Sequence, residues 1–246
     1  MKPCSVRRHQ ARDGMIRRQH ATVVLLAASL VAGWVASAAA DDAVESRQMV
    51  ENARFSVENF ALDPNMETFR DLVKKARGML IVPQLVRAGF IIGGSGGTGV
   101  LVARDERTGA WSEPAFYTVG SASLGFQAGV DASEVVLLFM TNRGVTTLLS
   151  NNLKLGADAS VALGPIGVGI GGATAGLSAD VVTFSRSKGL YGGVSLEGAV
   201  IAIRETLNSA YYGKYATPVD ILMRREVSNP ASAALLETVT KVSNPE

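Results

Sequence analysis

The pattern of apolar positions predicts helices at both ends of residues 41–246 and short strands between them. In residues 41–62 most apolar side chains follow spacings of three and four, which is typical of a helix with one buried face, although Val44 and Phe55 fall off that face. Asp63 followed by Pro64 is a helix start signal, so a second helix is predicted over residues 66–76. Two further helices are predicted near the C-terminus, over residues 218–223 and 230–242.

The central region is a series of strand-like segments separated by glycine, proline and polar turns. Residues 79–82 and 134–140 are apolar runs typical of buried strands, and Pro83 is expected to end the first. Two glycine-rich runs, residues 89–99 and 164–176, also contain Ile and Val, so they are interpreted as closely packed strands. The predicted fold class is α+β, with a glycine-rich, mostly antiparallel sheet or partly closed barrel packed by N-terminal and C-terminal helices.

The first glycine run also invites a phosphate-binding interpretation. Residues 94–99 approach the spacing G-x-G-x-x-G, which cradles phosphates when a helix follows directly. Here no Lys-Ser or Lys-Thr pair follows, and residues 100–104 have the pattern of a strand. The required context is therefore missing, and a packing role is predicted for these glycines.

The first forty residues have the pattern of a secretory signal peptide. An apolar run, residues 21–35, is followed by small residues ending at Ala40, which form an A-x-A exit. Five arginines precede the apolar run: Arg7, Arg8, Arg12, Arg17 and Arg18. Cleavage after Ala40 would leave residues 41–246 as a single mature domain. The alternatives are an uncleaved membrane anchor, and translation that begins at Met15.

Removal of this segment changes the chemistry that the chain offers. Cys4, His9 and His20 are the only cysteine and histidines, and all three would be lost. Disulfides, thiol nucleophiles, imidazole bases and ordinary zinc sites are then excluded, and no cofactor or metal is expected. The segment also carries six of the 24 basic residues and one of the 22 acidic ones, so the mature chain keeps 18 basic and 21 acidic residues. A net charge of about −3 argues against general nucleic-acid binding.

An ordered set of motifs gives the chain a recognisable pattern. In sequence order they are Gly78–Pro83, Gly89-Phe90, Trp111–Phe116 (WSEPAF), Gly164-Pro165, Phe184–Tyr191, Ser195–Gly198, and Asn208 with Tyr211–Gly213. Together they resemble the SYLF domain family, a lipid-binding domain also described as actin-binding, over roughly Ala43 to Met223. The resemblance implies a domain that in eukaryotes is joined to SH3 or FYVE modules and binds phosphoinositide-containing membranes, partly through an amphipathic N-terminal segment. Bacterial members are exported single-domain proteins.

For this chain the resemblance implies an exported lipid-binding module, periplasmic or associated with the cell envelope. Its expected partner is an anionic phospholipid membrane surface with phosphoinositide-like headgroups. Five basic side chains are candidates for lipid contact: Arg47 and Arg54 on the first helix, and Lys74, Lys75 and Arg77 on the second. The first helix also carries Glu45, Glu51 and Glu58, which weaken its attraction to anionic lipid, so the second helix is the better electrostatic candidate.

Two other functions remain open at this point. A structural or self-associating envelope protein, or a protein-interaction domain without lipid affinity, would use the glycine faces and the N-terminal helix as contact surfaces. A carboxylate-dependent hydrolase would need some of Glu113, Asp131, Asp180 and Glu197 to meet, and nothing in their spacing assembles them. We therefore expect no enzymatic activity. Trp111 and Phe116 are expected to be core anchors rather than ligand contacts.

Overall fold

The computed structural model describes residues 41–89, 92–124, 129–149, 152–164, 179–187 and 196–244 of the 246-residue chain. Contacts group Ala43–Glu246 into one compact unit. The predicted signal peptide, and residues 165–176 of the second glycine run, lie outside the described residues.

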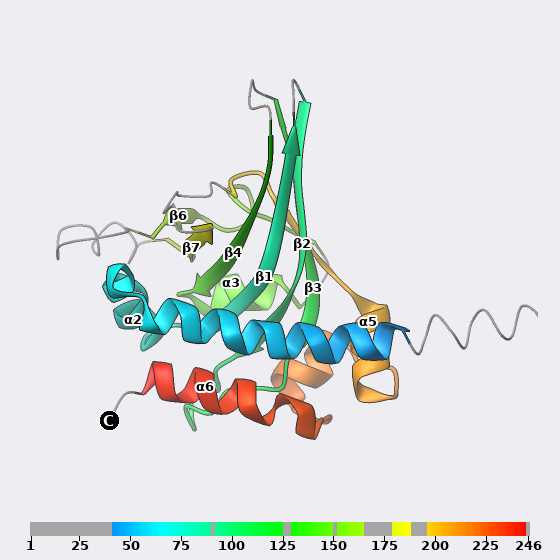
Figure 1. Ribbon diagram of the computed structural model, residues 1–246. Coiled ribbons are helices and arrows are strands. Elements are labelled where there is room, and N and C mark those ends of the chain that lie inside the picture. Colours follow the sequence, from blue (N-terminus) through cyan, green and yellow to red (C-terminus); the bar gives the residue numbers. More distant parts are fainter. Residues whose placement is uncertain are drawn as a thin grey trace, which may run out of the picture. The chain divides into compact units, whose positions relative to one another are not determined.

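One curled sheet of eight strands forms the centre of the described structure (Figure 1). The strand order is β5-β8-β3-β2-β1-β4-β7-β6, and every neighbouring pair is antiparallel except β6 and β7. The strands are β1 (Gly78–Gly89), β2 (Ile92–Ala103), β3 (Ala115–Leu124), β4 (Gly129–Phe139), β5 (Leu153–Lys154), β6 (Val161–Leu163), β7 (Val181–Ser187) and β8 (Val200–Ile203). The predicted α+β class with a mostly antiparallel sheet is confirmed.

Helical segments precede, interrupt and follow the sheet. The first, residues 41–62, is called the N-terminal helix below. The others are η1 (Pro64–Met66), α2 (Glu67–Val73), α3 (Asn142–Thr147), α5 (Glu205–Tyr212), η2 (Val219–Arg224), η3 (Pro230–Ser232) and α6 (Ala233–Ser243). Among the described residues, none of these helices combines the length and the apolar character needed to span a membrane.

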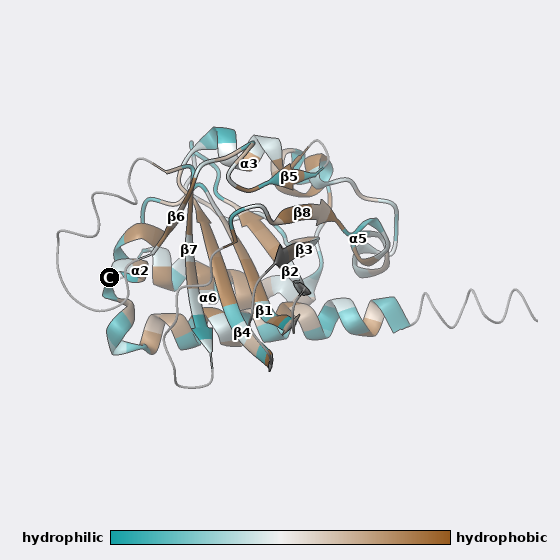
Figure 2. Ribbon diagram, turned by 90° about the horizontal axis from the view of Figure 1, so that it is seen from above, coloured by the Kyte–Doolittle hydropathy of each residue, from teal (hydrophilic) through white to brown (hydrophobic). Residues whose placement is uncertain are grey.

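The two faces of the sheet carry separate hydrophobic cores because side chains alternate along each strand. On one face, Met79, Ile81 and their neighbours pack against the N-terminal helix, α2, α5 and α6. On the other, Leu80 and Val82 pack with residues of α3, β5 and η2. Figure 2 shows the same arrangement from above, with the N-terminal helix and α6 on one side and α3 and β5 on the other.

Capping explains how the first two helices are joined. The Asp63 carboxylate accepts a hydrogen bond from the Asn65 backbone N–H at 2.9 Å, and Pro64 occupies the first position of η1. The Arg70 guanidinium then donates to the Asp63 carbonyl at 2.6 Å and to the Ala61 carbonyl at 3.2 Å, so it satisfies carbonyls at the end of the N-terminal helix. The predicted start signal at Asp63-Pro64 is confirmed.

The prediction that Pro83 ends its strand is wrong. Strand β1 continues to Gly89, and its register against both neighbours shifts around Pro83. A β-bulge tolerates proline because the extra residues need no ladder hydrogen bond. The bulge also brings the backbone close to β2, where a Cβ on Gly97 would lie 2.5 Å from the Gln84 carbonyl oxygen. Residues 94–99 are therefore part of a strand, as expected, and Gly97 permits this close approach.

Candidate functional site

The five predicted lipid-contacting residues lie on two segments of the fold. Arg47 and Arg54 are on the N-terminal helix, whereas Lys74, Lys75 and Arg77 follow α2 and lead into β1. The two groups have different electrostatic surroundings, and these are described in turn.

Arg54 on the N-terminal helix is held between two carboxylates of the same helix. Its guanidinium forms ion pairs with Glu51, three residues before it, and with Glu58, four residues after it, at 2.6 Å. The hydrogen bond from Arg54 lowers the pKa of the Glu51 carboxyl, so the pair stays ionised. Arg54 is thus a paired cation, and little of its charge is available to an anionic surface. Arg47 is exposed near the start of the same helix.

The second region gathers more cations than the sequence indicated. The Arg104 guanidinium donates to the Lys74 carbonyl and to the Asn244 side chain, both at 2.8 Å, and so links α2, the turn after β2 and the end of α6. We call the resulting surface the basic end. It consists of Lys74, Lys75, Arg77, Arg104, Arg107 and Lys241.

Only part of this positive charge is neutralised locally. Lys74 pairs with Asp71 at 2.9 Å, and Arg77 pairs with Glu106 at 3.5 Å. Within the part of the chain that the structure describes, Lys75, Arg107 and Lys241 form no ion pair, and all three are exposed. The basic end therefore presents free cations to solvent.

A groove of about 780 Å³ adjoins the basic end, between the N-terminal helix, α2 and α6. Its lining carries the apolar side chains of Leu62 and Val242 and both signs of charge: the basic residues Arg54, Arg70, Lys74 and Lys241, and the acidic residues Glu58, Glu67, Asp71 and Glu237. Leu62 is 81% exposed, so its side chain is open to solvent beside these charged residues. Cations beside exposed apolar side chains are the combination that interfacial proteins use at anionic membranes.

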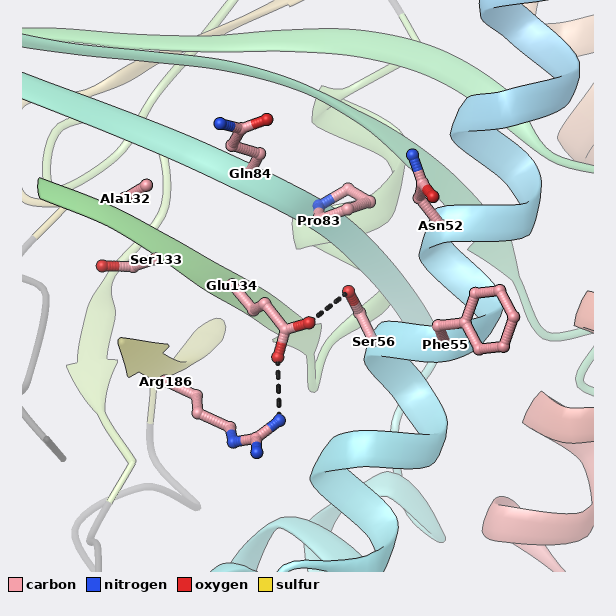
Figure 3. A pocket seen from close by; sticks show the side chains of 9 residues that line it. All are labelled: Asn52, Phe55, Ser56, Pro83, Gln84, Ala132, Ser133, Glu134 and Arg186. Carbon is pink, nitrogen blue, oxygen red and sulfur yellow. Dashed lines mark hydrogen bonds and ion pairs between the residues drawn. The ribbon is translucent and has the colours of Figure 1, made fainter. Parts of the chain in front are cut away.

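A second hollow, of about 490 Å³, lies between the N-terminal helix and the bulged part of the sheet (Figure 3). Its centre is Glu134, which pairs with Arg186 at 3.2 Å and accepts hydrogen bonds from Ser56 at 3.3 Å and from Asn59 at 3.1 Å. Arg186 also approaches Asp63 at 3.7 Å. These contacts fasten the N-terminal helix to β4 and β7, so we assign Glu134 a structural role.

Motif residues around Trp111 fasten the C-terminal segment to the sheet. Trp111 is buried, and its indole N–H donates to the Ser243 hydroxyl at 3.0 Å. Glu113 accepts a hydrogen bond from the Ser232 hydroxyl at 2.7 Å, and burial raises the pKa of the Glu113 carboxyl. The Tyr212 hydroxyl donates to the Pro114 carbonyl at 2.7 Å, and Phe116 is fully buried. The motif therefore holds α6, with Lys241, in place.

The carboxylates considered for hydrolysis belong to different parts of the fold. Asp131 lies near the start of β4, whereas the Asp180 backbone is bonded to Met140, just beyond the other end of that strand. Glu113 is engaged with Ser232, and Glu197 is exposed beside Gly156. Among the described residues, no three His, Cys, Asp or Glu side chains are grouped so that they could hold a metal ion.

Comparison with known proteins yields a family and a set of relatives. The sequence model of the family described as "Ysc84: Las17-binding protein actin regulator" matches residues 120–242. The human SH3 domain-containing YSC84-like protein 1 is 35% identical over 164 residues, covering 66% of this chain and 47% of the human protein. Protein YSC84 of Saccharomyces cerevisiae is 35% identical over 170 residues, covering 67% of this chain and 36% of the yeast protein. The chain thus spans less than half the length of these relatives.

Proposed function

Because the chain belongs to the Ysc84 family, which is the SYLF family that its motifs resemble, we propose that it is a non-enzymatic module that binds anionic phospholipid membranes through its basic end. The observation that carries this proposal is the clustering of Lys74, Lys75 and Arg77 with Arg107 and Lys241 beside a groove lined by Leu62. Phosphates of phospholipid headgroups, including phosphoinositide-like ones, are the ligands that such a surface attracts.

The expected binding is weak for one molecule and sensitive to salt. Each Lys or Arg near an anionic leaflet contributes about 1 kcal/mol, and this contribution falls off within a Debye length. Lys74, Lys75 and Arg77 together would then strengthen binding by roughly a hundredfold. Insertion of Leu62 would add a smaller apolar contribution.

We further propose that the protein acts after export, in the periplasm or at the cell envelope. The support is the sequence pattern of residues 1–40, in which basic residues, an apolar run and an A-x-A exit follow one another. Fractionation of cells that express the full chain, with mass spectrometry of the N-terminus, tests this part. An N-terminus at Asp41 in the exported fraction supports it, and an intact N-terminus in the cytosol contradicts it.

Cosedimentation with vesicles tests the membrane function. Protein purified from cells expressing the full chain should bind phosphatidylglycerol vesicles at low salt and should lose this binding at high salt. It should not bind neutral phosphatidylcholine vesicles. The variant Lys74→Glu/Lys75→Glu/Arg77→Glu should lose most of this binding. A matched control, Arg87→Glu/Lys154→Glu/Lys214→Glu, changes the net charge equally at other surfaces and should retain most of it. Equal loss in both variants would show that only net charge matters, and would contradict a site at the basic end.

The descriptions of the relatives favour one alternative. The family is described by Las17 binding and actin regulation, so a protein-interaction domain without lipid affinity is the second candidate. A chain that binds no anionic vesicle at low salt but retains a protein partner on a column would favour this second candidate.

A further inference from the structure

The outer face of the N-terminal helix carries a row of exposed large apolar side chains. Val44, Phe55 and Leu62 are 52%, 48% and 81% exposed. At 100° per residue, separations of 11 and 7 residues bring them to nearly the same side of the helix. The opposite side carries the buried residues Val50 and Val57. Figure 3 shows the Phe55 ring directed away from Glu134 and the sheet.

The positions between these apolar side chains are polar, and two of the three are acidic. Gln48, Glu51 and Glu58 complete a row with alternating steps of four and three residues, from Val44 to Leu62. Such spacing is that of a coiled-coil seam. The Arg54 guanidinium lies beside the row and is 4.1 Å from the centre of the Phe55 ring. Phe and Arg side chains are typical of protein interfaces, whereas carboxylates within the row are unfavourable against an anionic membrane.

We propose that this row pairs with the same row of a second copy of the chain, with the two helices antiparallel. Charge decides the direction. A parallel pair would place Glu51 against Glu51 and Glu58 against Glu58, and like charges across a seam repel. An antiparallel pair whose two-fold axis crosses the helix at the level of Ala53 avoids both contacts.

The antiparallel register also matches complementary side chains. Val44 of one copy meets Leu62 of the other, and Glu58 meets Gln48. Arg47, an exposed cation with no ion pair among the described residues, lies beside Glu58 of the second copy. The two Phe55 residues lie on either side of the two-fold axis. At a rise of 1.5 Å per residue, they are roughly 6 Å apart along the direction of the helices. The same arrangement is repeated on both sides of the axis, as a two-fold interface requires.

The size of the contact predicts a weak dimer that depends on concentration. Residues 44–62 make roughly five helical turns, and one helix pair of this length lies at the small end of specific interfaces. This pairing uses none of the cations of the basic end, although Leu62 belongs both to this row and to the groove beside the basic end.

Cysteine cross-linking tests the pairing and its direction without lipid. In a Cys4→Ser background the chain contains no other cysteine. Under mild oxidation, a mixture of Val44→Cys and Leu62→Cys copies should form a covalent dimer that links position 44 to position 62. Either variant alone should form much less, and so should Tyr215→Cys mixed with Leu62→Cys, because Tyr215 is exposed outside the N-terminal helix. Efficient cross-linking within each single variant would indicate a parallel pair and overturn the proposal.

Sedimentation equilibrium with a charge swap gives an independent test. Phe55→Ser should weaken dimerisation at least tenfold while leaving the thermal transition of the monomer nearly unchanged, since Phe55 is exposed. Arg47→Glu should also weaken it, and Arg47→Glu/Glu58→Arg should restore it by exchanging the two charges. A protein that remains monomeric at about 1 mM, the weak end of specific association, overturns the proposal. A monomer whose vesicle binding falls with Phe55→Ser would assign this face to the membrane instead.

Discussion

The N-terminal helix and the basic end both carry cations that the sequence offers as lipid contacts, but the structure gives those cations different surroundings. On the helix, Arg54 is flanked at both neighbouring turns by carboxylates that pair with it. At the basic end, Lys75, Arg107 and Lys241 have no such partner among the described residues. The difference shows that a count of basic residues does not identify an anion-binding surface. The carboxylates one turn away decide how much charge is available.

The largest effect that we expect is on stability, through the contacts that attach the N-terminal helix to the sheet. Glu134→Ala should lower the free energy of unfolding by about 2 kcal/mol, because Arg186, Ser56 and Asn59 lose their shared partner. Urea denaturation measures this, and Glu134→Gln, which keeps a carbonyl acceptor, is the control and should lose less. If Glu134→Ala is as stable as the wild type, the N-terminal helix is not fastened through this residue.

A smaller effect is expected on vesicle binding when a carboxylate that pairs with a cation of the basic end is removed. Asp71→Asn removes the carboxylate 2.9 Å from Lys74, so it should strengthen binding to anionic vesicles by about fivefold, the equivalent of about 1 kcal/mol. The control is Glu67→Gln, a removal of negative charge at the start of the same helix. Equal strengthening by both substitutions would mean that the position of the charge is unimportant.

The smallest effect is a dependence of stability on pH. Burial raises the pKa of Glu113 above its ordinary value, so the folded protein retains this proton to higher pH than the unfolded chain does. The stabilisation is fully present below the ordinary glutamate pKa and is lost as pH rises through the raised one. Glu113→Gln should therefore reduce the decline of thermal stability above the ordinary glutamate pKa. An identical pH profile in wild type and variant would contradict this role of Glu113.

Local patterns predicted much of this structure, and distant contacts account for what they missed. The helical period of residues 41–62 and the cap at Asp63 depend on neighbouring residues, and the structure has both. Pro83 was misjudged because a bulge is determined by pairing with two other strands. The short helix α5 was missed, since eight residues after a strand give little periodic signal.

The candidate site shows the same limit. Lys74, Lys75 and Arg77 are adjacent in sequence and could be proposed from it. Arg104 and Lys241 join them only because the turn after β2 and the end of α6 pack beside α2. The pairing of Arg54 was partly visible, because acids three residues before and four residues after an arginine lie on one side of a helix.

The measurement that tests the central claim most directly compares two double variants for binding to phosphatidylglycerol vesicles at low salt. Lys74→Gln/Lys75→Gln and Arg47→Gln/Arg54→Gln each remove two positive charges, so their net charges are equal. If the basic end is the membrane-binding surface, the first variant should bind roughly tenfold more weakly or worse, and the second should stay within about twofold of the wild type. Greater loss in the Arg47/Arg54 variant would place membrane binding on the N-terminal helix and contradict the account.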